Sequence, residues 1–309
     1  MRTGLSLALV ASLAVLAGRP DPARAQKGDA LVLALYAPSI PFKDTASRLA
    51  YLKLLADAIG GNIGRRVEPR LYNNLAQLKS ASPDFAIVEP QCAGGSWRPI
   101  ATAKIDKRLS RPWSFYVSGD ETMSSLKGKK IAFAAAGCDD RKFIENVLFR
   151  SEVRLRYFKS STGKPTVSGA VAEVATVHAA QAVFAPTANR AGVKKLFDAG
   201  EVPNPVLVVV NGQLDRKLVD QVQDSAQKFG SSAAVDGWGP VDRQAQSDLS
   251  RRMRGASKTF FVAELPPLHL PVKEIVETAG GDTALVPVRR YFDLEKTAAR
   301  KTGKTSAAK

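Results

Sequence analysis

The sequence predicts an α/β protein with two successive lobes, and three observations point to this architecture. Short apolar runs alternate with segments of helical periodicity, which is typical of a largely parallel sheet with helices packed on it. This alternation stops at the Gly94-Gly95 loop and restarts with a buried strand at Ile131. Removing an expected signal peptide of 25 residues from the 309 leaves a length that suits two cores better than one.

The first lobe begins with an apolar strand at 30–40, followed by a helix over 45–59 that Gly60-Gly61 should end. The apolar face expected for this helix consists of Leu49, Leu52, Ala56 and Ile59. Continuing along the chain, we expect a strand at 67–72, a short helix at 73–78 and a strand at 85–89. Two strand–helix steps followed by a third strand favour parallel pairing in this half of the chain.

The second lobe begins with a strand at 131–136 and a helix over 140–149, for which Asp139 is a suitable N-cap. Residues 171–177 fit either a strand or a helix. The remaining expected elements are strands at 182–185, 205–210 and 259–263, and helices at 214–229, 241–253 and 272–278. The run Pro205–Val210 is the strongest strand signal in the chain.

The N-terminus has the features of a secretory signal peptide over residues 1–25. Met1-Arg2 precede an apolar run at 5–17, which is shorter than the about 20 residues that span a bilayer. The triplet Ala23-Arg24-Ala25 has the small-x-small pattern that signal peptidase cleaves. We therefore expect cleavage before Gln26 and a periplasmic or secreted protein, with a retained membrane anchor as the alternative.

The chain is basic, with a formal net charge of +16. Residues 296–309 carry five of the positive charges and no acid, and they lack apolar periodicity. We expect these residues to form a disordered basic tail. Net positive charge suits an anionic partner or a membrane surface, but the exported location argues against nucleic acid as the partner.

Few residues of the sequence suit metal binding or catalysis. It contains two cysteines, Cys92 and Cys138, and two histidines, His178 and His269. The cysteines could form a disulfide, lie separately in the core, or bind a thiophilic metal. The sequence lacks a G-x-S-x-G elbow, an H-E-x-x-H motif and a Walker loop, and neither histidine has triad partners nearby. We expect no enzyme activity, no cofactor and no dedicated metal site.

Three segments resemble the type II periplasmic solute-binding proteins of ABC transporters, and the phosphate/phosphonate-type subgroup in particular. They are Leu126–Ala132 (LKGKKIA), Pro83–Val88 (PDFAIV) and Ala180–Phe184 (AQAVF). Two positions depart from that family. Gln181 replaces an acidic residue, and the turn at 137–140 reads GCDD where the family has Ser, Thr and His.

The resemblance implies a two-lobed periplasmic-binding-protein-like (type II) fold with a central cleft. Lobe one would comprise residues 26–122 and 231–295, and lobe two residues 123–230. It also implies a function without catalysis, in which the cleft captures a small solute for an ABC permease in the inner membrane. The alternative is a sensor or scaffold that has kept the fold without transport, and the two departures favour it.

In such a fold the strand ends of both lobes face the cleft, so the loops that follow the strands should carry the ligand site. Asp139 and Asp140 would occupy the helix N-terminus where an anion docks, which predicts a cationic, zwitterionic or metal-containing ligand and poor phosphonate binding. Cys92 and Cys138 should both border the cleft. Asp139 could instead simply cap the helix, and Glu89 could be solvated or paired with a lysine. The residues expected to bind ligand are Tyr36, Ser39, Tyr72, Asn73, Glu89, Gln91, Gly137, Cys138, Asp139 and Asp140.

Overall fold

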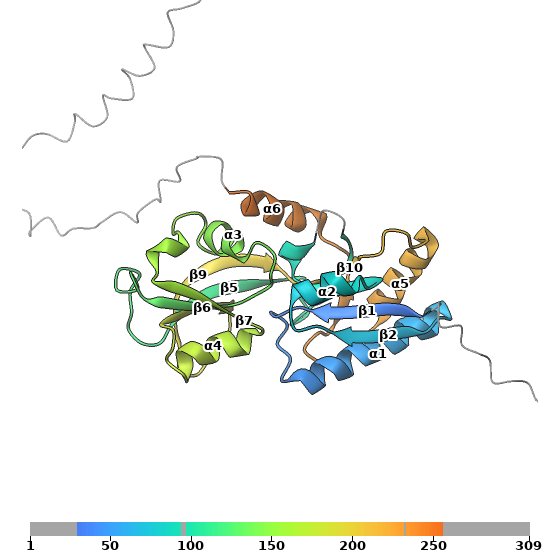
Figure 1. Ribbon diagram of the computed structural model, residues 1–309, viewed down its shortest axis with the longest axis horizontal. Coiled ribbons are helices and arrows are strands. Elements are labelled where there is room, and N and C mark those ends of the chain that lie inside the picture. Colours follow the sequence, from blue (N-terminus) through green and yellow to red (C-terminus); the bar gives the residue numbers. More distant parts are fainter. Residues whose placement is uncertain (1–29, 94–96, 232, 256–309) are drawn as a thin grey trace, which may run out of the picture. The chain divides into compact units, whose positions relative to one another are not determined.

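The computed structural model describes residues 30–93, 97–231 and 233–255, which belong to one compact unit (Figure 1). The expected signal peptide, the basic tail, the strand at 259–263 and the helix at 272–278 lie outside the described residues. No helix within the described ranges combines the length and apolarity needed to cross a bilayer.

The first sheet has six strands in the order β11-β4-β10-β3-β1-β2. Strands β2 and β3 pair parallel with β1, and β10 inserts antiparallel between β3 and β4. The sequence neighbours β3 and β4 are therefore not paired with each other. The strand bounds are β1 Leu31–Tyr36, β2 Val67–Leu71, β3 Phe85–Val88, β4 Arg98–Lys104, β10 Val206–Val209 and β11 Gly237–Gly239.

The second sheet has five strands in the order β7-β6-β8-β5-β9. Strands β7 and β8 pair parallel with β6, whereas β5 pairs antiparallel with both β8 and β9. The strand bounds are β5 Ser110–Val117, β6 Lys130–Ala134, β7 Ser160–Lys164, β8 Ala182–Pro186 and β9 Lys194–Pro203. The protein is thus a two-lobed α/β molecule, with one mixed sheet in each lobe (Figure 1).

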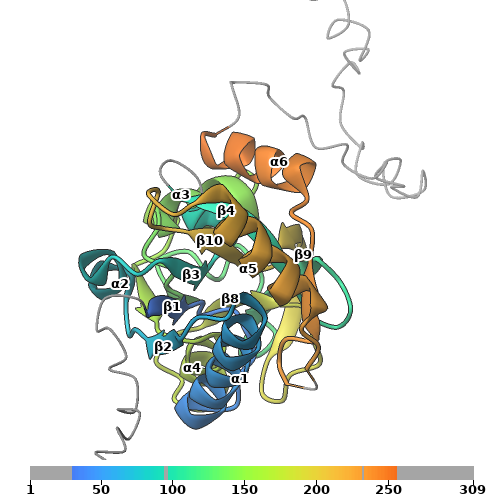
Figure 2. The same cartoon turned by 90° about the vertical axis from the view of Figure 1, so that its right-hand side faces the viewer.

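Helices α1 (Thr45–Ile63) and α5 (Arg216–Lys228) pack together against the first sheet (Figure 2). Helix α2 (Leu75–Ala81) belongs to a separate cluster of buried apolar side chains that includes Tyr36 and Trp97. The N-cap of helix α1 is Asp44, whose side chain accepts a hydrogen bond from the Ser47 amide. It continues through Gly60-Gly61, so the expected end there is wrong.

Gly60 allows a close contact with the backbone of Arg65 and does not end the helix. A Cβ at this position would lie 2.8 Å from the Arg65 carbonyl oxygen. The helix ends at Gly64, which has the left-handed conformation with φ 67°. The expected apolar face is also partly wrong, because Leu49 is 47% exposed, while Leu52, Ala56 and Ile59 are buried.

The second sheet is covered by α4 (Val167–Ala175) and by a helical segment formed by α3 (Asp140–Lys142), the π-helix η2 (Phe143–Leu148) and the following turn. The ambiguous residues 171–177 thus begin as helix. Five phenylalanines, joined by contacts at ring-centroid distances between 4.5 and 6.4 Å, form the centre of this core. They are Phe115, Phe149, Phe158, Phe184 and Phe197.

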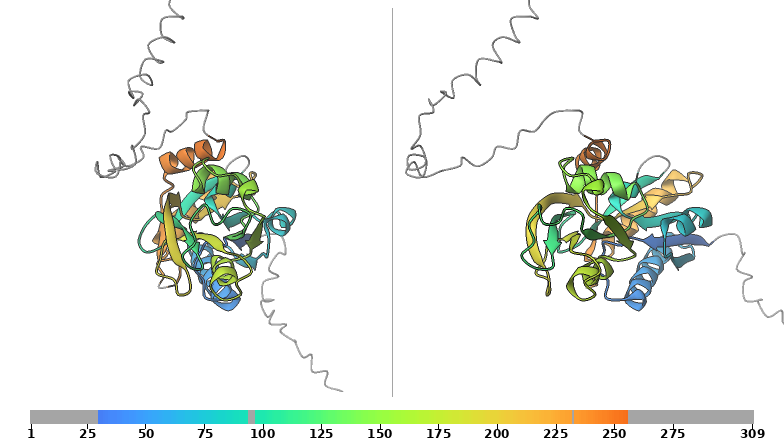
Figure 3. Two further views of the ribbon diagram at one scale, coloured as in Figure 1. Left: turned by 90° about the vertical axis from the view of Figure 1, so that its left-hand side faces the viewer. Right: turned by 60° about the vertical axis from the view of Figure 1, so that its left-hand side comes forward.

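The chain passes between the sheets at three places. It crosses from β4 to β5 between Lys104 and Ser110, and returns from β9 to β10 between Pro203 and Val206. These crossings come earlier along the chain than the expected lobe boundaries at residues 122 and 230. After β11 the chain crosses again, because α6 (Arg243–Met253) packs on η2 and β9 of the second lobe (Figure 3). Residues 243–253 therefore lie on the second lobe, although we expected them in lobe one.

Candidate functional site

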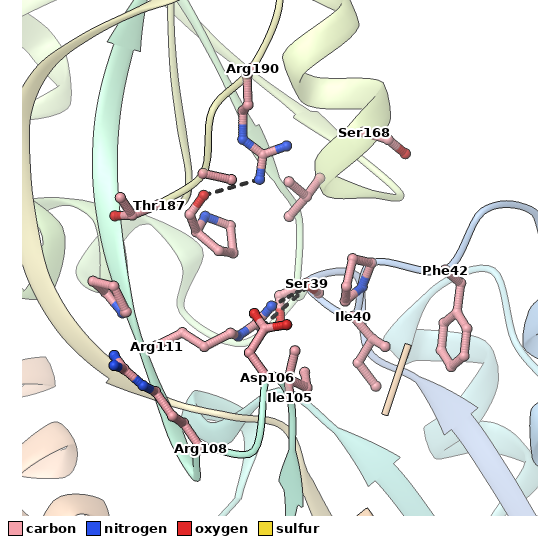
Figure 4. A pocket seen from close by; sticks show the side chains of 15 residues that line it. Ser39, Ile40, Phe42, Ile105, Asp106, Arg108, Arg111, Ser168, Thr187 and Arg190 are labelled. Carbon is pink, nitrogen blue, oxygen red and sulfur yellow. Dashed lines mark hydrogen bonds between the residues drawn. The ribbon is translucent and has the colours of Figure 1, made fainter. Parts of the chain in front are cut away.

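A cavity of about 490 Å³ lies where the first crossing meets both lobes (Figure 4). Lobe one contributes the loop after β1, and lobe two contributes the N-terminus of α4 and the loop after β8. The turn before β5 and the start of β5 complete the wall. The lining residues are Ser39, Ile40, Pro41, Phe42, Ile105, Asp106, Arg108, Arg111, Pro112, Val167, Ser168, Pro186, Thr187, Ala188 and Arg190.

Ser39 connects two buried charged side chains at the floor of this cavity. The Glu89 carboxylate accepts hydrogen bonds from the Ser39 amide at 2.6 Å and from the Ser39 hydroxyl at 2.9 Å. The Arg111 guanidinium donates to the Ser39 carbonyl at 3.3 Å and to the Ser39 hydroxyl at 3.1 Å. All three residues are at most 6% exposed. One serine therefore bridges an acid and a base that do not touch each other directly.

Burial shifts the pKa values of Glu89 and Arg111. Loss of solvation raises the pKa of Glu89, although the hydrogen bonds from Ser39 and the charge of Arg111 oppose the shift. Loss of solvation likewise lowers the pKa of Arg111 to about 10, which leaves its guanidinium charged at neutral pH. Arg111 is held further by the Asn204 amide oxygen, 2.6 Å from its Nε. The positive charge at the cavity floor is thus fixed in place.

Two more arginines line the cavity. Arg190 donates to the Pro186 carbonyl at 3.0 Å, and its Nε is buried without a partner in the part of the chain that the structure describes. Its guanidinium lies 6.0 Å from the centre of the Tyr116 ring. Arg108 is exposed at the rim. Within the described residues, no ion pair joins any of the three guanidinium groups to a carboxylate.

The remaining polar groups of the lining are mostly hydroxyls. Ser39, Ser168 and Thr187 contribute these, and Asp106 is the one carboxylate among the lining residues. Ser168 belongs to the first turn of α4, whose helix dipole places positive potential at this end. Three arginines against Asp106 and the buried Glu89 beneath the floor give the cavity a net positive charge.

The segments after β3 and β6, which we expected to border the cleft, contact each other directly at another edge of the interface between the lobes. Cys92 and Cys138 form a disulfide with their Cα atoms 5.2 Å apart. Beside it, the Tyr36 hydroxyl of lobe one donates to the Ala135 carbonyl of lobe two at 2.6 Å. Burial, with the charges of Asp140 and Glu89, raises the pKa of Tyr36 to about 12, so the hydroxyl stays protonated and able to donate. This edge is closed by packing and by a covalent bond.

The two aspartates of the GCDD turn do not line the cavity. The Asp140 carboxylate accepts hydrogen bonds from the amides of Ala136 and Gly137 at 3.0 and 2.9 Å, and burial raises its pKa. Asp139 is exposed, has φ 52°, and pairs with Lys142 at 3.0 Å. Asp139 occupies the N-cap position of α3 as expected, but its side chain makes no cap hydrogen bond within the described residues. This placement removes the reason for expecting a cationic ligand.

Of the ten residues expected to bind ligand, Ser39 lines the cavity and Glu89 supports it from below. Tyr36, Gly137, Cys138 and Asp140 lie at the disulfide edge, where Tyr72 also packs. Gln91 is half-buried beside that edge, and its side-chain oxygen has no partner among the described residues. Asn73 and Asp139 are exposed.

Sequence reasoning missed the three arginines that give the cavity its charge. The only signal for Arg111 was a charged residue at the start of the apolar run RPWSFYV. Arg190 lies in a loop without any motif. Because both cysteines are used in the disulfide, they do not provide thiolates for a metal. The described residues also contain no cluster of three or more His, Cys, Asp or Glu side chains suited to a metal ion.

No protein-family model matches the sequence, and no curated protein matches it. Solved structures do resemble the fold. The Prochlorococcus marinus protein PhnD1, solved with methylphosphonate, superposes with a TM-score of 0.58 at 11% identity, over 73% of this chain and 97% of its own. A Xanthomonas citri protein solved with ATP gives a TM-score of 0.57 at 15% identity, over 73% and 97%.

The binding-protein component of a phosphonate ABC transporter from Pseudomonas aeruginosa gives a TM-score of 0.57 at 11% identity, over 72% of this chain and 85% of its own. These matches cover 72–73% of this chain and 85–97% of the solved proteins' length. Together with the two sheets, the crossing strands and the cavity between the lobes, they show that the described chain has the two-lobed fold of type II periplasmic solute-binding proteins.

Proposed function

We propose that this protein is an exported solute-binding protein that captures a small anionic solute in the interlobe cavity, without catalysis. The observation that carries the proposal is the lining of that cavity, in which Arg108, Arg111 and Arg190 face one aspartate and form no ion pairs within the described residues. Guanidinium groups bind carboxylates and phosphonates through paired hydrogen bonds, so such a lining suits an anion.

The architecture of the site supports small-molecule capture. A cavity of about 490 Å³ lies within the size range of small-molecule pockets. Both lobes contribute hydroxyl groups to its lining, as in a site that encloses its ligand from two sides. The solved proteins of similar fold include one bound to methylphosphonate, which is an anion of suitable size.

Export and transport belong to the same proposal. The basic start, short apolar run and Ala23-Arg24-Ala25 triplet support secretion to the periplasm. The fold supports delivery of the solute to an ABC permease of the inner membrane, which is the role of the phosphonate transporter component with this architecture. N-terminal sequencing of the mature protein from the periplasmic fraction should begin at Gln26.

A sensor or scaffold without transport is the second candidate, and one observation favours it. The Cys92–Cys138 disulfide ties together two loops from opposite lobes, whereas delivery to a permease generally requires the lobes to separate. Transport assays in a strain that lacks the protein separate the two functions, because only a transport component is needed for uptake.

Binding is tested by calorimetry and thermal shift on the mature protein. The probes are methylphosphonate, inorganic phosphate and succinate, compared with putrescine and calcium. We expect at least one of the three anions to bind and stabilise the protein, and neither cation to do so. Binding of putrescine or calcium without binding of any anion would overturn the proposal.

The matched variants are Arg190→Met and Arg216→Met. Arg190 lines the cavity, while Arg216 is a largely exposed arginine on α5. Loss of one charge-assisted contact should weaken anion binding by at least tenfold in the first variant. The second variant should bind as the unmodified protein does. Equal binding by both variants would place the anion outside this cavity.

A further inference from the structure

The two lobes are tied together at several points besides the crossing strands. The strongest tie is the Cys92–Cys138 disulfide, which links the segment after β3 to the turn after β6. Next to it, Tyr36 donates to Ala135 across the lobes. Farther along the interface, the Val167 amide at the start of α4 donates to the Pro38 carbonyl of lobe one at 3.1 Å. The disulfide is the only covalent tie among these contacts.

Helix α6 adds a tie across the same edge. It contacts the 3-10 helix η1 (Pro90–Cys92), which holds one disulfide cysteine, and also η2 of the second lobe. Its C-terminal part is anchored on the second lobe, where Arg252 donates to the Val147 carbonyl at 2.7 Å and Asn146 donates to the Met253 carbonyl at 3.1 Å. The disulfide and α6 therefore hold the same edge of the interface.

The cavity remains open although the lobes are tied. Asp106, Arg108, Ser168 and Thr187 line it and are exposed. Neither disulfide cysteine lines it. These exposed residues leave the cavity open to solvent without any separation of the lobes.

We propose that the Cys92–Cys138 disulfide locks the lobes closed, so that solute enters and leaves through the exposed rim, and that reduction of this bond releases the hinge. The inference concerns regulation of the site described under the proposed function and rests on that function for its biological meaning. In the oxidised protein the crossing strands hold one side of the interface and the disulfide holds another. Hinge opening about the crossings would have to separate the two cysteines, which the bond forbids.

The chemistry of release needs a reductant, and a dithiol is the class that suits an exported disulfide. One thiolate of the dithiol attacks a sulfur of the disulfide, and the second resolves the mixed disulfide. Two electrons and two protons pass to Cys92 and Cys138, which become thiols, while the dithiol closes to its own disulfide. Both cysteines are half-buried in this structure, so part of the bond's surroundings is open to such an attack.

The test follows one backbone amide that bridges the lobes and needs no solute. Hydrogen exchange of the Val167 amide is measured by NMR on the mature protein, oxidised and after reduction with dithiothreitol. The Ala170 amide is the control, because it donates to the Thr166 carbonyl within helix α4. The variant Cys92→Ser/Cys138→Ser provides the unlocked state without reductant. A failed solute screen would leave this experiment unaffected.

We expect Val167 exchange to accelerate at least tenfold on reduction and in the double variant, with Ala170 changing less than twofold. Equal Val167 exchange in the oxidised and reduced protein would overturn the proposal, because other contacts would then hold the lobes. Fast Val167 exchange in the oxidised protein would overturn it too, since the lobes would separate with the bond intact. Parallel acceleration of both amides would indicate unfolding of α4, and would also contradict a hinge lock.

Discussion

At the scale of single residues, the molecule depends on charged groups held inside the protein. Glu89 and Arg111 are both almost fully buried, and Ser39 donates to one and accepts from the other. Burying a charge is costly unless hydrogen bonds and an opposite charge compensate. The trio provides both, and it holds the loop after β1 in the shape that lines the cavity.

Replacing Arg111 by methionine should destabilise the protein strongly. The substitution leaves the Glu89 charge uncompensated and removes the hydrogen bond that Arg111 donates to the Asn204 side-chain oxygen. Removing one member of a buried charge pair costs about 3–5 kcal/mol of unfolding free energy, measurable by urea denaturation. Arg190→Met, at the half-buried rim, should cost about 1 kcal/mol or less. Similar costs for the two variants would contradict a structural role for Arg111. Adding Glu89→Gln to Arg111→Met should restore part of the loss.

The raised pKa of Glu89 predicts a pH dependence of stability. Because the folded protein binds this proton more tightly than the unfolded chain, the stabilisation is complete below the ordinary pKa of a glutamate. It is lost as pH rises through the raised pKa of the folded state. Urea denaturation from pH 4 upward should therefore reveal a contribution to the free energy of unfolding that falls as pH rises and that Glu89→Gln lacks. The measured quantity is the difference in slope between the unmodified protein and the variant, because other carboxylates titrate in both, Asp140 with a raised pKa and Asp44 and Asp198 with lowered pKa values. Identical slopes would show that Glu89 does not titrate in this range.

At the scale of elements, the turn between β6 and α3 places Cys138 against Cys92. Gly137 makes this possible, because it has φ 77° and a Cβ there would lie 3.1 Å from Cβ of Leu75 in the other lobe. Leu75 is buried, so a shift of its side chain would disturb the packing around it. The turn therefore needs glycine both for its backbone conformation and for the close contact between the lobes.

Gly137→Ala should cost more stability than Gly128→Ala. Both glycines have positive φ, but an added Cβ at Gly128 meets no atom within 4 Å. The strained backbone costs about 1–2 kcal/mol in each variant. The clash with Leu75 is added only at Gly137, and it should also slow formation of the disulfide during refolding. Thermal unfolding and thiol titration check both effects. Equal losses in the two variants would mean that the lobes do not approach as closely as described.

The disulfide itself should contribute substantially to stability. Its cysteines are separated by 46 positions, for which loop-closure entropy corresponds to about 4 kcal/mol. Cys92→Ser/Cys138→Ser should lower the unfolding free energy by up to this amount. The reduced unmodified protein should match the double variant. If reduction left the denaturation midpoint unchanged, the bond would not constrain the unfolded chain in the expected way.

Sequence patterns located several strands with apolar runs and several helices. The strands β1, β3, β6, β8 and β10 and the helices α1, α5 and α6 appear where periodicity predicted them. Strand β9 was missed because charged side chains of Lys194–Pro203 lie at a sheet edge, where solvent accepts them. Strand β7 was missed for a similar reason, since Ser160–Lys164 is almost entirely exposed. These two edge strands carry too little apolar signal to be recognised from one sequence, whereas the edge strand β2 was predicted at 67–72.

At the scale of the whole molecule, the two lobes followed from the restart of the pattern at Ile131, but the composition of the cavity did not. The cavity forms where the chain crosses between sheets, so its walls come from segments far apart in sequence. Ser39 was found because it follows a strand. Arg111 and Arg190 could not be found, because only the pairing of β5 with β8 brings their segments together.

The position of β10 has a consequence for biogenesis. Strands β3 and β4 follow one another in the chain, yet β10 lies between them and pairs with both. Until Val206–Val209 has been synthesised, the growing chain exposes two strand edges in the middle of its first sheet. Such edges invite pairing with other chains. Cys92 and Cys138 both precede β10 in the chain, so their disulfide can form while the sheet is still incomplete. A chaperone that shields strand edges would then be required mainly in the interval between β4 and β10.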